Sequence, residues 1–313
     1  MENQLTSTPP EAPRPLQPML PPAGTLLKES FVFYKKHLGL IVGIAVVPII
    51  LSLALILLGD IQVPYVFAIG ALILVIISSL SYIALTIAVS KNGVVEGDVV
   101  GAYSASVNLL IPNIWMSLIS MCAVIGGFVL LFVPGFYLAL AISLGIFVLI
   151  VENKRGLDAL AQSWHYVRGY WGHIFGKLFF FGVAMILISI AVGIVAAIAT
   201  LPLLGSDQKN DMIFDIVSQI LQGLVLGPLG TIYLYLIYQG MRKIKPEPAN
   251  HIEFEGLKNK LRTVAILGVV AIVAFIALLI KTSDGFNPQF RIPTSGLPSG
   301  AGWAELLQIV DFK

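Results

Sequence analysis

Charged residues and cysteine are both scarce in this chain. Only 12% of its 313 residues are charged, and 57% are hydrophobic, whereas roughly a quarter of the residues in soluble domains carry a charge. The one cysteine, Cys122, lies inside an apolar run, so neither a disulfide framework nor a thiol metal cluster can form within the chain. The composition excludes an ordinary soluble domain and indicates a protein embedded in a lipid bilayer.

The motifs that membrane enzymes use are missing as well. The sequence contains no HExxH zinc helix, no GxSxG nucleophile elbow, no glycine-rich phosphate loop and no pair of aspartates in the middle of an apolar run. The histidines lack metal-ligand spacing among themselves; they are His37, His165, His173 and His251. We therefore predict no catalytic residue, no cofactor, no metal site and no enzymatic activity.

Long apolar runs are abundant. About 20 apolar residues in helical form cross a hydrocarbon layer of about 30 Å, and seven runs reach that length, near residues 38–58, 64–89, 113–132, 135–151, 171–201, 213–238 and 263–280. None shows the alternating pattern of a membrane β-barrel. The predicted fold class is an all-α, polytopic membrane protein with about seven transmembrane helices.

The two ends of the chain differ from its apolar middle. Residues 1–22 contain seven prolines and lack the basic start and cleavage site of a signal peptide, so they are predicted to be a disordered cytoplasmic tail. Residues 246–262 are predicted to be a basic cytoplasmic linker, 263–281 the seventh transmembrane helix, and 282–313 an external tail rich in Gly, Pro and Ser.

The distribution of basic residues predicts the orientation. Lysines and arginines collect in short cytoplasmic loops, and 15 of the 19 fall on one side of the predicted topology. That side holds the N-terminus and the long loops. The turns near 59–62 and 133–135, the 207–211 loop and the C-terminus are then external. We predict a multi-pass protein of the cytoplasmic (plasma) membrane that contacts the anionic cytoplasmic leaflet, and its net charge of +2 does not suggest nucleic acid.

An internal repeat organises residues 23–245. The stretch SFVFYKKHLGLIVG from Ser30 aligns with SWHYVRGYWGHIFG from Ser163, matching an aromatic residue, a basic residue and two glycines, and a weaker copy begins at Asp98. Apolar residues recur at the 4-3-4 spacing of one helix face in each copy. We predict three repeats of an amphipathic interfacial helix, near 24–37, 97–110 and 156–169, each followed by a transmembrane hairpin, plus the extra C-terminal transmembrane helix.

The repeat supplies most of the candidate interfacial or structural residues, which are Glu152, Arg155, Asp158, Trp164, Arg168, Trp171, Gly172 and Gly176. Tryptophans are expected at the depth of the headgroups, and small residues four apart allow helix backbones to approach closely. Glu152 is expected to close a helix at the cytoplasmic edge, with Lys154, Arg155 or Arg168 neutralising it. A catalytic role for it is the less favoured alternative.

Two lines of polar residues lie within the apolar runs. Asp211, Asp215, Ser218 and Gln222 share one helix face. They fit the wet outer end of a long helix better than the alternative, an ion or solute site, because Asp215 falls at or beyond the outer interface. Ser78, Tyr82 and Thr86 form the second line. Interhelical hydrogen bonds are the favoured interpretation there, and a conduction path is the alternative.

One part of the chain resembles a known family. The run from Val133 to Gly176 looks like the membrane domain fused to some bacterial glycerophosphodiester phosphodiesterases and like related stand-alone membrane proteins. The matching residues are Pro134, Gly135, Tyr137, Glu152, Gly156, Asp158, Ala159, Ser163, Trp164, Arg168, Gly169 and Trp171. Near the end of the core, Pro228, Tyr233, Tyr235, Tyr238 and Arg242 resemble the family's exit from its last helix, with Gly240 where the family has aspartate.

The resemblance spans residues 25–245 and implies a helical membrane domain. The phosphodiesterase activity of the fused proteins belongs to a separate soluble barrel of about 250 residues, and the sequence contains no such segment. We therefore expect a non-catalytic membrane protein that acts as an anchor, a scaffold or a lipid-contacting module, with an unknown protein partner as a further possibility. The alternative is a small transporter, channel or lipid-translocating protein, and a lipid-modifying enzyme is the least favoured.

Overall fold

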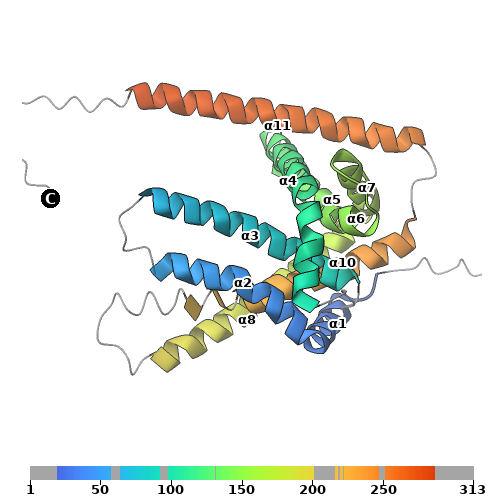
Figure 1. Ribbon diagram of the computed structural model, residues 1–313. Coiled ribbons are helices and arrows are strands. Elements are labelled where there is room, and N and C mark those ends of the chain that lie inside the picture. Colours follow the sequence, from blue (N-terminus) through green and yellow to red (C-terminus); the bar gives the residue numbers. More distant parts are fainter. Residues whose placement is uncertain are drawn as a thin grey trace, which may run out of the picture. The chain divides into compact units, whose positions relative to one another are not determined.

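The computed structural model describes residues 20–57, 64–91, 98–130, 132–200, 216–217, 219–220, 222–246 and 251–285. These residues form helices and short turns, and no strand occurs among them. The helices are α1 (Ala23–Lys36), α2 (Leu38–Leu57), α3 (Pro64–Ser90), α4 (Asp98–Leu130), α5 (Phe132–Ile142), α6 (Gly145–Val151), α7 (Leu157–Val167), α8 (Trp171–Thr200), the π-helix η2 (Gln222–Leu226), α10 (Gly227–Ile244) and α11 (His251–Gly285). The all-α prediction is confirmed (Figure 1).

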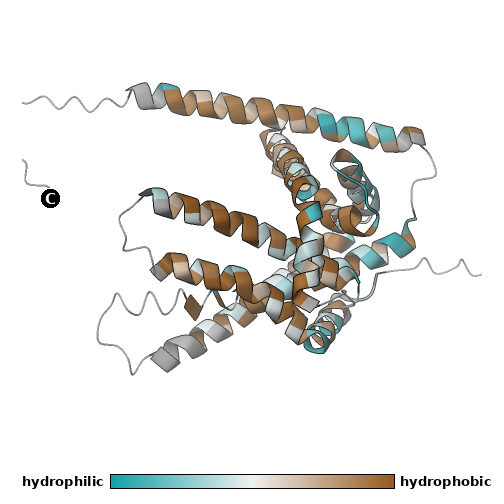
Figure 2. Cartoon of the chain, viewed as in Figure 1, coloured by the Kyte–Doolittle hydropathy of each residue, from teal (hydrophilic) through white to brown (hydrophobic). Residues whose placement is uncertain are grey.

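Seven segments within the described residues are long and apolar enough to cross a membrane. They are Leu38–Ile56, Phe67–Ser90, Val99–Val129, Phe132–Val151, Trp171–Ala191, Gly223–Ile244 and Phe254–Lys281. Figure 2 shows apolar residues along most of the length of α2, α3 and α8. Side chains on the outside of these helices are large and apolar, as lipid contact requires. The chain is a multi-pass integral membrane protein.

Two expected element boundaries differ in the structure. The sequence suggested an interfacial helix near 97–110 and a separate span at 113–132, but α4 runs unbroken through both, with Pro112 inside it. A proline removes only one backbone hydrogen bond, so a long helix can bend there and continue. In the same way, α11 begins at His251 and takes in most of the predicted linker at 246–262.

A third difference concerns the span predicted at 135–151. It consists of two helices, α5 and α6, separated by a turn at Ser143 and Leu144. The Ser143 hydroxyl donates to the carbonyl of Leu140 at 2.8 Å, and the Ser163 hydroxyl of α7 donates to the carbonyl of Ala141 at 2.7 Å. The Leu140 carbonyl also accepts the backbone N–H of Ser143 at 3.3 Å, and the Ser163 hydroxyl gives the Ala141 carbonyl a donor from another helix.

The chain divides into two compact units, Met1–Val269 and Val270–Lys313. In the first unit, the main helix pairs are α4 with α5, α2 with α3 and α3 with α4, while α1 packs along α10. Large side chains fill its centre, including Phe147, Tyr166, Tyr233 and Tyr238, each no more than 1% exposed. The described part of the second unit continues α11, and its large apolar side chains are exposed.

The helix predicted near 156–169 is observed as α7, and it is more enclosed than a helix lying flat on lipid would be. Eight of its eleven residues are buried, because it packs against α5 and α6 and also contacts α4 and α10. By contrast, α1 has only two buried residues, Leu26 and Ser30. The two helices that share the repeat therefore differ in how much of their surface lipid can reach.

Close backbone contacts involve other glycines than those expected. A Cβ at Gly172 or Gly176 would meet no atom within 4 Å outside its own stretch of helix, so neither residue provides a close helix crossing. Such a crossing occurs instead at Gly126 of α4, where a Cβ would overlap the Val264 carbonyl and lie 2.8 Å from the Gly268 nitrogen of α11. The prediction for Gly172 and Gly176 is wrong because spacing alone does not say which face meets a neighbour.

Candidate functional site

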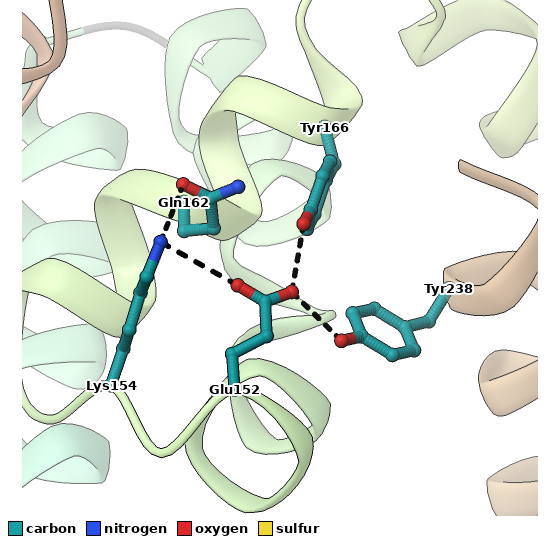
Figure 3. Close-up of polar contacts among 5 residues, drawn as sticks. All are labelled: Glu152, Lys154, Gln162, Tyr166 and Tyr238. Atoms are coloured by element: carbon teal, nitrogen blue, oxygen red, sulfur yellow. Dashed lines mark hydrogen bonds and ion pairs between the residues drawn. The ribbon is translucent and has the colours of Figure 1, made fainter. Parts of the chain in front are cut away.

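Polar side chains from three parts of the fold converge on Glu152, and Figure 3 shows their arrangement. One carboxylate oxygen of Glu152, Oε1, accepts hydrogen bonds from the hydroxyls of Tyr166 at 2.7 Å and Tyr238 at 2.8 Å. The other, Oε2, lies 3.6 Å from the Lys154 ammonium. Lys154 also donates to Oε1 of Gln162 at 3.2 Å. We call these five residues the Glu152 cluster.

The turn between α6 and α7 sets the position of the cluster. Glu152 is the C-terminal cap of α6, and the chain reverses through Asn153 at φ 55° and Gly156 at φ 54°. Asparagine and glycine tolerate this left-handed region better than other residues. Gln162 and Tyr166 then occupy one face of α7, because residues four apart on a helix are neighbours.

The cluster is buried. The Glu152 side chain is 4% exposed and that of Lys154 27% exposed. Burial raises the pKa of Tyr166, and its hydrogen bond to Glu152 raises it further. The Tyr166 hydroxyl therefore stays protonated and remains a donor at physiological pH. A carboxylate with two such donors and a neighbouring ammonium is compensated, as a buried charge must be.

Aromatic packing surrounds the cluster. The ring of Phe147 lies 5.7 Å from the rings of both Tyr235 and Tyr238, and Tyr166 meets Tyr238 edge to face at 6.0 Å. The Tyr235 hydroxyl donates to the carbonyl of Ser90, at the end of α3, at 2.9 Å. The cluster thus joins α6, α7 and α10, and the adjacent rings extend the connection to α3.

Further polar contacts fix the two ends of α7. Lys245 donates to the carbonyls of His165 at 2.6 Å and Arg168 at 2.9 Å, which lie at the C-terminal end of the helix. Near its N-terminal end, Asp158 accepts from Lys258 of α11 at 2.8 Å. Both placements also match the helix dipole, because the carboxylate lies near the N-terminus and the ammonium near the C-terminus.

The other residues of the predicted interfacial set have separate surroundings. The Trp164 indole donates to the Tyr137 hydroxyl at 3.0 Å, and the ring of Trp171 lies 6.3 Å from that of Tyr137. Trp171 is 47% exposed. Arg155 and Arg168 are exposed. Lys154, one of the basic residues expected to neutralise Glu152, forms an ion pair with it at 3.6 Å.

Of the two predicted lines of polar residues, the structure describes the side chains of only the second. Asp211, Asp215 and Ser218 lie outside the described residues, and Gln222 lies in η2 with its side chain also outside them. In the second line, the Thr86 hydroxyl donates to the Tyr82 carbonyl of its own helix at 2.8 Å. The expectation of interhelical hydrogen bonds is wrong for Thr86, and the side chains of Ser78 and Tyr82 form no hydrogen bond with a described residue.

A second set of polar contacts, which was not predicted from the sequence, involves the carbonyls four residues before two prolines. Proline lacks an N–H, so the carbonyl four residues earlier in a helix loses its partner. For Pro48 that carbonyl is Ile44, which accepts from Ser81 at 3.0 Å and Tyr103 at 2.9 Å. For Pro228 it is Leu224, which accepts from the Tyr34 hydroxyl at 2.8 Å.

These bonds satisfy backbone groups that lipid cannot. They join segments far apart in the chain, so no local spacing could have identified the partners. A proline inside an apolar run nevertheless indicates that the carbonyl four residues before it needs a hydrogen-bond donor from elsewhere in the chain.

Within the described residues, the chain contains no group of three His, Cys, Asp or Glu side chains that could hold a metal ion.

Comparison with known protein families, with curated proteins and with solved structures finds no match to this chain.

Proposed function

We propose that the protein is a non-catalytic component of the cytoplasmic membrane that acts as an anchor, a scaffold or a lipid-contacting module. The Glu152 cluster carries this proposal. Its carboxylate is engaged by two tyrosine hydroxyls and a lysine, so its contacts connect helices, and its side chain is only 4% exposed, which gives a substrate little access to it. A general acid or base must come within hydrogen-bond reach of the proton that it transfers.

The resemblance to the membrane domain of glycerophosphodiester phosphodiesterases is part of this proposal. Glu152 and Tyr238, two residues on which the resemblance depends, bond to each other here. Residues that hold one fold together would be shared by domains of the same architecture. We propose the orientation that the distribution of lysines and arginines predicts. The N-terminus is then cytoplasmic, the C-terminus is external and the basic end of α10 lies at the anionic leaflet.

The test uses the purified full-length protein in liposomes. Release of a trapped fluorescent solute and exposure of a labelled phospholipid to an external quencher are measured against protein-free liposomes. We expect both rates to equal those of the protein-free control. Movement of either species that disappears in Asp215→Asn, with thermal stability unchanged, would show that the protein is a transporter instead.

A small transporter, channel or lipid-translocating protein is the second candidate, because Ser78 and Tyr82 are polar and exposed within a membrane span. Single cysteines introduced at positions 78, 82, 218 and 222 test this candidate. A water-filled path predicts that all four react with a membrane-impermeant thiol reagent. Protection of all four from that reagent would argue against a pore.

A further inference from the structure

Hydroxyl groups in the described membrane helices usually donate to a carbonyl. Ser79 donates to Val75, Thr86 to Tyr82 and Ser120 to Met116, each at 2.8 Å. This pattern is expected, because hydrocarbon offers no hydrogen-bond partner and an unsatisfied polar group there costs several kcal/mol. The exceptions among these groups therefore indicate where the protein leaves room for a partner.

Four polar side chains between α3 and α4 are such exceptions. Ser78, Tyr82, Asn113 and Ser117 form no hydrogen bond with any residue that the structure describes. Ser78 and Tyr82 lie near the middle of the span Phe67–Ser90, and Asn113 and Ser117 near the middle of Val99–Val129. Each of the four is therefore at least two helical turns from either end of its apolar segment.

All four side chains line one pocket of about 490 Å³. Ser78 and Tyr82 also line an adjacent pocket of about 190 Å³ between α2, α3 and α10, next to the two prolines Pro48 and Pro228. Small-molecule sites commonly have volumes of about 300–1,000 Å³, with apolar walls and a few polar groups. The larger of the two pockets lies within that range, and Leu74 and Val75 contribute apolar wall to it.

Tyr82 gives the strongest indication of a ligand. A serine hydroxyl can rotate onto a carbonyl of its own helix, as Ser79 does, so Ser78 and Ser117 could be satisfied internally. A tyrosine hydroxyl stands too far from its own backbone to do so. Tyr82 is 42% exposed within a segment that is apolar enough to cross a membrane, and the buried amide of Asn113 faces the same pocket.

The lining also defines the charge of the ligand. None of the described residues that line the two pockets is charged, and an ion within a membrane span without a counter-charge would be costly. The hydroxyl and amide groups can donate to oxygen atoms. We propose that this site binds a neutral, lipid-soluble molecule that presents carbonyl or hydroxyl oxygens on an apolar body, which is the shared chemistry of diacylglycerols and quinones.

This inference rests on the lipid-contacting part of the proposed function and specifies its ligand class. The experiment uses the full-length protein in nanodiscs and two photoreactive probes, a diacylglycerol and a short-tailed quinone. Saturable crosslinking is measured for each, and the site of attachment is mapped by mass spectrometry. The probe that saturates at lower concentration identifies the source of the oxygens.

Tyr82→Phe is the main variant, because it removes only the hydroxyl and keeps the ring. Tyr65→Phe is the matched control, since Tyr65 lies on the same helix and is 79% exposed near its start. Losing one hydrogen bond to a neutral ligand should weaken binding about fivefold to tenfold. We expect that loss in Tyr82→Phe, none in Tyr65→Phe, and crosslinks on α3 or α4 near the four polar residues.

Three results would overturn the inference. They are the absence of saturable crosslinking with both probes, equal binding by Tyr82→Phe and the unaltered protein, and efficient disulfide formation between two copies that carry cysteine at position 82. The last result would mean that a second copy of the chain covers this surface. The liposome transport assay separates the two proposals, because transport would refute the scaffold function while leaving the binding result intact.

Discussion

The Glu152 cluster and the pocket between α3 and α4 hold similar polar groups in opposite circumstances. In the cluster, two tyrosine hydroxyls and an ammonium surround one buried carboxylate. In the pocket, a tyrosine hydroxyl and an amide have no partner in the described part of the chain. Because a polar group gains little in lipid unless it is paired, the first arrangement stabilises the fold, and the second becomes favourable only when something binds.

The largest effect on stability is expected at the cluster. Glu152→Ala removes the shared acceptor and leaves the Lys154 charge and the hydroxyls of Tyr166 and Tyr238 without it. Breaking one partner of a buried pair typically costs about 3–5 kcal/mol. Thermal unfolding in detergent should show this loss. Glu255→Ala is the control, since the Glu255 side chain is 42% exposed and solvent screens its pair with Lys258; equal losses in both variants would contradict a structural role for the cluster.

The next effect concerns the bond between Tyr34 and the Leu224 carbonyl. Tyr34→Phe should cost about 1–3 kcal/mol, because the carbonyl is left unsatisfied. In a Pro228→Ala background the cost should fall, because residue 228 then supplies an N–H of its own.

A double-mutant cycle by thermal unfolding measures this coupling, expected at about 1 kcal/mol. Additivity of the two changes within about 0.3–0.5 kcal/mol would mean that Tyr34 does not compensate for Pro228. Tyr65→Phe again controls for loss of a hydroxyl at an exposed position.

A smaller effect is expected from pH. The pKa of Tyr166 is raised in the fold, first by burial and then by Glu152, whereas a tyrosine in an unfolded chain ionises at a pKa of about 10. The stabilisation from this hydroxyl is therefore complete below about pH 10 and is lost as the pH rises towards the folded pKa. The slope contributed by one group is at most about 1.4 kcal/mol per pH unit.

Unfolding of the unaltered protein and of Tyr166→Phe, compared between pH 8 and pH 11, tests this expectation. The variant should lose less stability over the alkaline part of the range. Identical slopes would mean that Tyr166 ionises as easily in the fold as in the unfolded chain.

The smallest effect is expected for the pair of Lys258 with Asp158, whose side chains are 31% and 48% exposed. Solvent screens such a pair, and exposed ion pairs contribute about 0.2–1 kcal/mol. Asp158→Asn should lower stability by that amount at low salt and by less at high salt. A loss that is both large and independent of salt would place this pair with the Glu152 cluster instead.

Hydropathy was sufficient to predict the membrane spans, because the length of an apolar run is a property of the local sequence. It failed at α4, since the boundary placed between the helix near 97–110 and the span at 113–132 falls inside one continuous helix. It also missed the turn between α5 and α6, which is supported by Ser163 from another helix. Whether a weak point in a helix becomes a bend, a break or neither depends on neighbours that are distant in the chain.

The candidate site was predictable only in part, for the same reason. Glu152 and Lys154 are close in sequence, so their pairing could be expected from the charge pattern. Tyr238 lies 86 residues from Glu152, and no pattern in the sequence around either residue predicts their hydrogen bond. Gln162 was missed because its neighbours on α7 appeared to face lipid, whereas the structure buries it.

The pairing of prolines with hydroxyl donors has a consequence for how this chain can diverge. Pro228 and Tyr34 are related through a single carbonyl, so replacing the proline makes the hydroxyl dispensable, while losing the hydroxyl first leaves a defect. Substitutions at the two positions should therefore follow a preferred order during divergence, and homologues that lack a proline at 228 should tolerate phenylalanine at 34. The carbonyl freed by Pro48 differs, because it belongs to Ile44 and accepts from both Ser81 and Tyr103. Either donor can be substituted while the other still satisfies that carbonyl.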